Sequence, residues 1–292
     1  MPSIRTRASD SPAVVGALVE LADEHSQSRA VISPERGAIV TSFSVGGREL
    51  LYLDESTLHD SSKNVRGGIP ILFPTPGKLE NDKWRRANRH GALKQHGFAR
   101  TTGWTVVESS ESSAAEITLR LLANEQTRAQ YPWDFQADFR FGLEGRRLRI
   151  STKLRNSSSA LLPFALGFHP YFKVSDKAHA RVVTPATKAF DNLTKQTGPL
   201  KAIDLTAPEV DLQLLDHGSS HCTLELGDGS RIELRGSPEY WLWVVWTLKG
   251  KDFVCVEPWT APGNALNSGD HLLELEPGRS HESWVEFEYV PG

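Results

Sequence analysis

The chain lacks an excess of positive charge and has no apolar run long enough to cross a membrane. Its 292 residues include 33 basic and 36 acidic side chains, which gives a formal net charge of −3. Proteins that bind nucleic acid concentrate lysine and arginine on their surface, and a membrane-spanning helix needs about 20 mostly apolar residues in succession. We therefore expect neither nucleic acid nor a membrane as a partner. The hydrophobic share of 39% also argues against a disordered chain.

Cysteine is scarce as well. Only Cys222 and Cys255 are present, too far apart for the short spacing of a zinc-binding loop and too few for a disulfide framework. We expect two buried thiols in a reducing compartment. Because the first residues show neither the continuous apolar stretch nor the cleavage site of a secretory signal, we predict a cytoplasmic protein in which residues 1–12 are flexible.

Several common active-site motifs are missing. The sequence has no glycine-rich phosphate loop, dinucleotide fingerprint, HExxH, CxxC or GxSxG. Its ten histidines include no pair at ligand spacing on a predicted helix. We therefore predict no cofactor and no metal, although the pattern leaves open a metal site assembled from distant strands. Acid–base chemistry by histidine and carboxylate side chains is the simplest remaining hypothesis.

What the sequence does contain is a strand pattern. Apolar and polar residues alternate in runs at 117–121, 137–143, 148–154 and 284–289. A period of two is typical of strands with one buried face. The pairs Glu144-Gly145, Gly46-Gly47 and Asp228-Gly229 lie between alternating runs, as turn residues do in hairpins.

The run 241–248 is apolar at almost every position, which predicts a strand covered on both faces. Helical patterns are few, and the best covers 124–130, just before Pro132. No long linker divides the chain. We predict an all-β protein in which residues 13–292 form one large antiparallel β-sandwich domain with few short helices.

Four segments place ionisable residues in apolar, strand-like surroundings. The first begins at Arg66-Gly67-Gly68, where the glycines permit close approach of a ligand and the guanidinium offers a planar fork for an anion or for sugar hydroxyls. Taken by itself, this segment is explained more simply by a glycine turn with a solvated arginine. The second is 95–100, where a strand would put His96 and Arg100 on one face with a phenylalanine between them. A structural histidine is the alternative there.

The third and fourth segments each contain one ionisable side chain. His169 lies among apolar residues and is either a core histidine or one whose pKa is tuned by its surroundings. Glu257 ends an apolar run and precedes a proline, and a buried carboxylate is costly unless it is paired or functional. A structural salt bridge is the alternative for Glu257.

Taken in order, the segments RGGIPILFP, QHGFAR, GFHPYF and CVEPWTAPGNAL resemble the aldose 1-epimerase (mutarotase) superfamily, with its galactose mutarotase-like fold. The resemblance runs from about Val15 to the C-terminus. It implies a β-supersandwich that interconverts the α and β anomers of an aldose without a cofactor or a metal. By the same resemblance His169 matches the general acid and Glu257 the general base.

The resemblance also implies a set of substrate-binding residues. His96 matches a histidine that contacts the sugar, and we add its neighbour Gln95, whose amide can donate and accept. Asp191 resembles an aspartate that binds sugar hydroxyls. Arg66 and Arg100 resemble the arginines that meet the phosphate in the hexose-6-phosphate branch, although Pro170 stands where those members usually have threonine, so a free aldose remains an equal expectation.

The sequence thus predicts a mutarotase acting on an aldohexose or a hexose 6-phosphate. One alternative is a non-catalytic carbohydrate-binding domain on the same fold, which would have no need of a paired acid and base. Another is a glycoside hydrolase or lyase, which normally uses two carboxylates. The combination of an imidazole with a carboxylate favours the epimerase.

Overall fold

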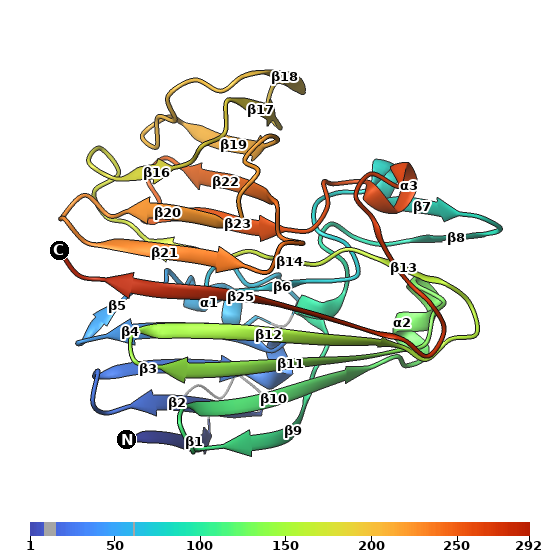
Figure 1. Cartoon of the computed structure of the whole chain (residues 1–292), viewed down its shortest axis with the longest axis horizontal. Coiled ribbons are helices and arrows are strands. Elements are labelled where there is room, and N and C mark those ends of the chain that lie inside the picture. Colours follow the sequence, from blue (N-terminus) through green and yellow to red (C-terminus); the bar gives the residue numbers. More distant parts are fainter. Residues whose placement is uncertain (9–15, 61) are drawn as a thin grey trace.

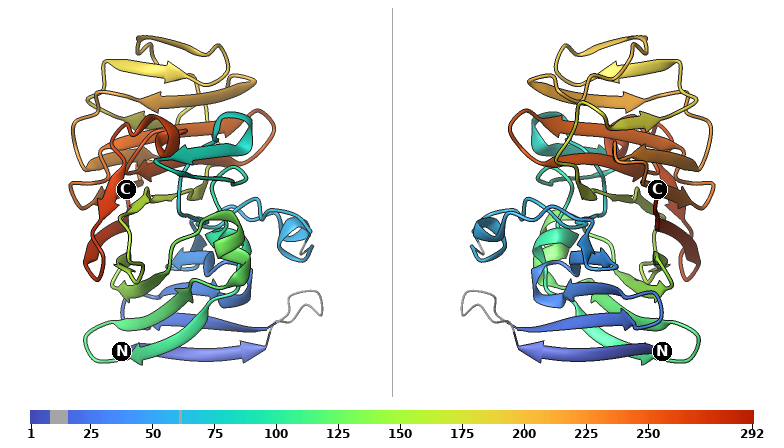
Figure 2. Two further views of the ribbon diagram at one scale, coloured as in Figure 1. Left: turned by 90° about the vertical axis from the view of Figure 1, so that its right-hand side faces the viewer. Right: turned by 90° about the vertical axis from the view of Figure 1, so that its left-hand side faces the viewer.

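The computed structural model describes residues 1–8, 16–60 and 62–292. Its strands form two broad antiparallel layers, seen face-on in Figure 1 and from the right-hand and left-hand sides in Figure 2, with the N-terminal strands at the bottom. The first layer is an eight-stranded sheet of β16 (Arg181–Val183), β20 (His221–Glu225), β21 (Arg231–Gly236), β25 (Ser280–Val290), β12 (Arg147–Asn156), β11 (Phe135–Glu144), β10 (Ala115–Leu122) and β9 (Thr105–Ser110).

The second layer combines two sheets. One has five strands, β1 (Pro2–Ala8), β2 (Ala17–Asp23), β3 (Ser28–Ser33), β4 (Ile39–Val45) and β5 (Arg48–Glu49). The other contains β18 (Gln196–Pro199), β17 (Lys188–Asp191), β19 (Glu209–Leu214), β22 (Leu242–Leu248), β23 (Phe253–Trp259), β14 (Gly167–Phe168) and β6 (Ile71–Leu72), with β15 (Tyr171–Lys173) also paired to β23. Isolated bridges between Val40 and Ile69 and between Leu51 and Phe172 join the two sheets.

Smaller elements gather at one end of the layers, on the right in Figure 1. They are the pairs β7 (Lys83–Arg86) with β8 (Arg89–Ala92) and β13 (Leu162–Phe164) with β24 (Leu273–Leu275), together with α2 (Glu125–Gln130) and α3 (Ala265–Ser268). The remaining short helices are α1 (Glu55–Leu58) and the 3₁₀ turns η1 (Pro34–Arg36), η2 (Glu80–Asp82) and η3 (Ala99–Thr101). None of the helices in the described ranges has the length and apolar content that a bilayer crossing requires.

The all-β prediction is confirmed, and its physical origin is visible in the alternation. Along β11 every second residue from Phe135 is buried, and β12 alternates in the complementary way. The buried set faces the five-stranded sheet, so that one continuous core fills the space between the layers. The run 241–248 forms β22, which is buried at most positions, as expected for a strand covered on both faces.

Two local predictions are confirmed and one is refined. The helix expected at 124–130 is α2, capped by the Asn124 side chain, which accepts a hydrogen bond from the backbone N–H of Thr127 at 3.0 Å. Gly46-Gly47 forms the two-residue turn between β4 and β5. Asp228-Gly229 does join β20 to β21, but in a longer loop in which the N–H of Leu226 donates to the carbonyl of Ser230.

The expectation that residues 1–12 are flexible stays a prediction, although the structure gives the first of them a regular conformation. Residues Pro2–Ala8 form β1, which pairs with β2 over its whole length, because an edge strand gains a full ladder of backbone hydrogen bonds. Residues 9–12 of that prediction lie outside the described residues. The prediction of a single domain over 13–292 stays a prediction.

Replacing Phe139 by alanine tests the core between the layers. Phe139 is fully buried on β11, and removing such a ring costs about 3–5 kcal/mol through lost burial and the cavity left behind. We expect a loss of that size in the free energy of unfolding, measured by urea titration. Arg140→Ala, at the next and exposed position of the same strand, should change it by less than about 0.5 kcal/mol. Equal losses for both variants would contradict the layer assignment.

Candidate active site

The four segments singled out in the sequence meet at one cavity of about 540 Å³ beside β23. Six of the predicted site residues line it, namely Arg66, Gln95, His96, Arg100, His169 and Glu257. Asp191 does not. Residues as far apart in the chain as Arg66 and Glu257 thus share one wall, which no local sequence pattern could establish.

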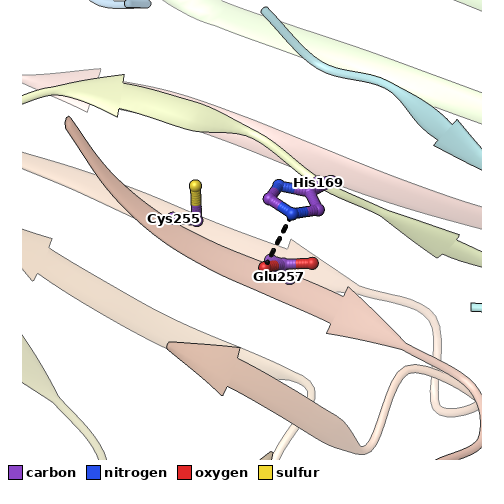
Figure 3. A group of neighbouring side chains, drawn as sticks. All are labelled: His169, Cys255 and Glu257. Carbon is purple, nitrogen blue, oxygen red and sulfur yellow. Dashed lines mark ion pairs between the residues drawn. The ribbon is translucent and has the colours of Figure 1, made fainter. Parts of the chain in front are cut away.

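The strand register explains how His169 and Glu257 meet. Gly167 in β14 pairs with Trp259, and Tyr171 in β15 pairs with Cys255, both on β23. This antiparallel register places His169, between β14 and β15, directly opposite Glu257. The imidazole Nε2 lies 3.3 Å from Oε1 of Glu257, as drawn in Figure 3.

Both groups are withdrawn from solvent. His169 is 8% exposed and Glu257 only 1%. The second carboxylate oxygen, Oε2, accepts a hydrogen bond from the indole N–H of Trp259 at 3.1 Å. That bond fixes the carboxylate plane and leaves Oε1 to the imidazole. The Nδ1 atom of His169 is buried without a hydrogen-bond partner among the described residues.

Burial dominates the protonation of this pair. It raises the pKa of Glu257 well above its usual value, and the nearby carboxyl of Asp211 adds to that rise. Burial likewise lowers the pKa of His169 to about 3, helped by the positive charges of Arg100 and Arg66. Between the lowered pKa of His169 and the raised pKa of Glu257 the pair therefore holds a single titratable proton, and the neutral form, imidazole with carboxylic acid, is favoured.

His96 is held as a neutral hydrogen-bond donor. Its Nδ1 accepts from the backbone N–H of Gly77 at 3.0 Å, so a neutral ring carries its proton on Nε2. Burial lowers the pKa of His96 well below its usual value, and the charges of His169 and Arg100 lower it further. Nε2 lies 3.2 Å from the side-chain amide of Gln95. The Gln95 atom at this distance is the amide nitrogen, which is itself a donor, so the protonated Nε2 is left to donate to a substrate oxygen.

The strand predicted for residues 95–100 is wrong. Gln95 and His96 form a turn followed by η3, and His96 and Gly97 adopt left-handed φ values of 70° and 69°. A Cβ on Gly97 would lie 2.2 Å from the carbonyl oxygen of Phe73, so only glycine allows this approach. Phe98 points into the core instead of lying between His96 and Arg100. Those two residues reach the cavity through the turn and not through strand alternation.

Four cationic side chains line the cavity. Arg100 donates from its guanidinium to the carbonyl of Gln95 at 2.8 Å, and burial lowers its pKa. Arg66 has an exposed side chain that reaches the same cavity. Lys78 and Lys195 also line it. The sequence analysis identified the arginines and missed both lysines, because solvated lysines are common in any loop.

The structure places Asp191 elsewhere and brings Asp211 into the cavity. The Asp191 carboxylate accepts from the backbone N–H groups of Leu193 and Thr194, at 2.7 and 3.2 Å, and so closes the turn between β17 and β18. Asp211, on β19, lines the cavity and accepts from the amide of Asn192 at 2.7 Å. Burial raises the pKa of Asp211.

A signal for Asp211 was present in the sequence. Within β19 the polar residues Glu209, Asp211 and Gln213 alternate with apolar ones, and all three line the cavity. Period-two alternation assigns them to one face of a strand but does not say whether that face meets solvent or a ligand. The choice of Asp191 over Asp211 followed from a loose sequence match.

One group at this site has the side chains of a metal centre. A ligand atom from each of His169, Cys255 and Glu257 lies within 4.8 Å of the other two, and all three residues are buried. Figure 3 shows the three side chains converging from β23 and the β14–β15 connection. The group is the only one of its kind found among the described ranges.

Comparison with known proteins agrees with this geometry. Residues 18–288 match the family described as Aldose 1-epimerase. The chain belongs to the aldose 1-epimerase family. It is therefore an isomerase of the epimerase type, and the resemblance of the four segments to that family is confirmed.

Individual relatives of this aldose 1-epimerase family member include plant and bacterial proteins. A protein of Cenchrus ciliaris named "Putative glucose-6-phosphate 1-epimerase" is 27% identical over 87% of this chain and 80% of its own length. The crystal structure of the Slr1438 protein from Synechocystis sp. PCC 6803 is 37% identical with a TM-score of 0.91, over 94% of this chain and 95% of that one.

A galactose mutarotase-like protein from Clostridium acetobutylicum has a TM-score of 0.86 at 17% identity, over 100% and 99% of the two chains. At that identity the likeness concerns the fold. The fold is galactose mutarotase-like, as the resemblance implied.

NMR titration of the imidazoles tests the buried site. We expect the ring signals of His169 and His96 to stay unchanged between about pH 5 and 8, because burial lowers both pKa values. The lowered pKa of His169 stabilises the fold above its unfolded value of 6.5, and that contribution is lost as the pH falls toward 3. The same signals in the urea-unfolded chain should titrate normally. A midpoint near 6.5 for folded His169 would contradict the assignment.

Proposed function

We propose that the protein catalyses mutarotation of an aldose, with Glu257 and His169 as its acid–base pair. The observation that carries the proposal is the 3.3 Å contact between Nε2 of His169 and Oε1 of Glu257 in the wall of a sugar-sized cavity. Ring opening removes a proton from the anomeric hydroxyl and adds one to the ring oxygen. One base and one acid, acting together, are the smallest machinery that does both.

The proposed cycle uses the single proton of the pair. In the closed-sugar complex Glu257 is a carboxylate and His169 an imidazolium. Glu257 takes the proton of the anomeric hydroxyl, His169 donates its proton to the ring oxygen, and the bond between C1 and the ring oxygen breaks. The aldehyde then rotates about C1–C2. The same two groups return their protons in exchanged roles as the ring closes on the other face.

The protonation preference of the site favours the product of ring opening and disfavours the charged pair from which ring opening starts. Ring opening converts the charged pair into the neutral pair, and burial favours the neutral pair. A bound sugar places hydroxyl groups near the pair, which stabilises the charged form enough for the closed complex to exist. The charged pair is therefore the form that opens the ring, and the neutral pair is the form that closes it. Each step produces the form that the next step needs, so no proton has to come from solvent.

Asp211 takes the role that the sequence assigned to Asp191. It lines the cavity with Gln213, whereas the Asp191 carboxylate is engaged in its own turn. A carboxylate is an acceptor for two sugar hydroxyls at once. Together with the donor His96 and the amide of Gln95, Asp211 orients the sugar ring against the acid–base pair.

We further propose that the cavity accepts a hexose 6-phosphate, with the phosphate at Arg66 and Arg100. Both guanidinium groups line the cavity, and both act electrostatically on His169. Planar guanidinium groups bind phosphate oxygens in pairs. The relative from Cenchrus ciliaris carries the name of a glucose-6-phosphate epimerase, which points to the same substrate class.

The variant Glu257→Gln tests the base. It keeps the shape of the side chain and removes its basicity, so we expect anomer exchange to fall about 10²–10⁴-fold while the fold is retained. Exchange is measured by saturation-transfer NMR on glucose, galactose and glucose 6-phosphate, with the spontaneous rate subtracted. Glu276→Gln, at an exposed position, is the matched control and should behave as the wild type.

Two results would decide against this assignment. Undiminished exchange in Glu257→Gln would remove Glu257 as the base. A wild-type protein that binds the sugar in a thermal-shift assay but does not accelerate exchange would instead be a carbohydrate-binding domain.

Alanine substitution of Arg66 and Arg100 tests the phosphate site separately. A charge-assisted hydrogen bond is worth about 1.5–3 kcal/mol, so each variant should lose about 10–100-fold in kcat/KM for glucose 6-phosphate. Turnover of free glucose should fall far less. Arg146→Ala, an exposed arginine in the β11–β12 turn, is the control. Equal losses on both sugars would contradict a phosphate site.

A further inference from the structure

We propose that His169, Cys255 and Glu257 form a binding site for Zn²⁺, and that the ion inhibits the enzyme when it binds there. The inhibitory half rests on the function proposed above, whereas the binding half does not. Cys255 has no part in the acid–base chemistry, and it does not line the sugar cavity directly. Its thiol lies behind the pair, fully buried.

The sheet brings the three side chains together. Cys255 and Glu257 are two positions apart on β23, so their side chains leave the same face of the strand. The β14–β15 connection supplies His169 directly opposite Glu257. Figure 3 shows the three side chains as close neighbours beside β23. Two ligands from one strand and a third from its neighbour form a rigid site.

The distances are close to those of a tetrahedral zinc centre. Zinc binds nitrogen and oxygen at about 2.0–2.2 Å and sulfur at about 2.3 Å, which places neighbouring ligand atoms about 3.3–3.6 Å apart. The nitrogen-to-oxygen separation of His169 and Glu257 is already 3.3 Å. The three ligand atoms lie within 4.8 Å of one another. A side-chain shift of about 1 Å therefore completes the geometry.

Charge balance favours the occupied site as well. Because burial raises the pKa of Cys255 and of Glu257 and lowers that of His169, the cluster without an ion is neutral, with one proton on the His169–Glu257 pair and one on the thiol. Binding of Zn²⁺ releases both protons and leaves a thiolate, a carboxylate and a neutral imidazole around the dication, so the filled site is again neutral. A neutral cluster is tolerated in a buried environment, where a net charge would be expensive.

The surroundings fit a three-ligand site with one open position. The indole of Trp259 holds Oε2 of Glu257, so the carboxylate binds through Oε1 alone. Because His169 and Glu257 line the cavity, the fourth position faces the space where the sugar binds. An ion there occupies the lone pairs that the acid–base cycle uses. Inhibition should consequently be competitive with the sugar.

Cobalt spectroscopy tests the site directly, without reference to activity. Co²⁺ bound by a thiolate gives an intense near-ultraviolet charge-transfer band, and Zn²⁺ added in competition removes it. We expect this band in the chelator-treated wild type, and we expect Cys255→Ser to lose it, with Zn²⁺ affinity weakened at least about tenfold. The matched control is Cys222→Ser, which alters the other buried free thiol and should leave the band and the affinity unchanged.

The outcomes separate the metal proposal from the proposed function. A missing band in the wild type, or a band retained in Cys255→Ser, would overturn the zinc site whether or not the protein is an active mutarotase. If the band is present and anomer exchange is undiminished by bound Zn²⁺, the ion does not occupy the acid–base pair and the inhibitory role is wrong. If Cys255→Ser unfolds, the thiolate band of the wild type and competitive inhibition by Zn²⁺ decide the question.

Discussion

The antiparallel register of β14 and β15 on β23 is the constraint from which the site follows. Backbone pairing at Gly167 and Tyr171 leaves His169 no position other than opposite Glu257. The separation of the two side chains is thus fixed by backbone hydrogen bonds and not by their mutual attraction. Such a pair keeps its geometry in either protonation state, which a cycle of alternating proton transfers requires.

Burying the ionisable groups of His169 and Glu257 costs free energy. Contacts with the surrounding residues and loss of charge reduce that cost. The indole of Trp259 donates to Glu257, and neutralisation of the pair avoids two uncompensated charges. The guanidinium groups of Arg66 and Arg100 disfavour an imidazolium next to them. The same buried environment surrounds Cys255, so the proposed acid–base pair and the proposed zinc site share two side chains.

The residues around the pair come from irregular backbone as much as from strands. His96 reaches the cavity only because Gly97 adopts a left-handed conformation against Phe73. Asp211 reaches it from one face of a regular strand. The irregular turn directs a hydrogen-bond donor into the cavity from outside the sheet, whereas β19 directs its polar side chains into the cavity from one face of a regular strand.

The sequence by itself determined the all-β class, the hairpin of β11 and β12 and the helix α2, and it singled out His169 and Glu257 as the proposed acid–base pair. Each of these features depends on residues that are close together in the sequence: a two-residue period, a capping residue, or a short segment of neighbouring residues. Only the tertiary structure decided that 95–100 is a turn, that Asp211 and not Asp191 faces the cavity, and that Cys255 joins the pair. These three features depend on register and packing between strands that are far apart in the chain. A local pattern shows which face of a strand is polar, but it does not show whether that face contacts solvent, a ligand or another strand.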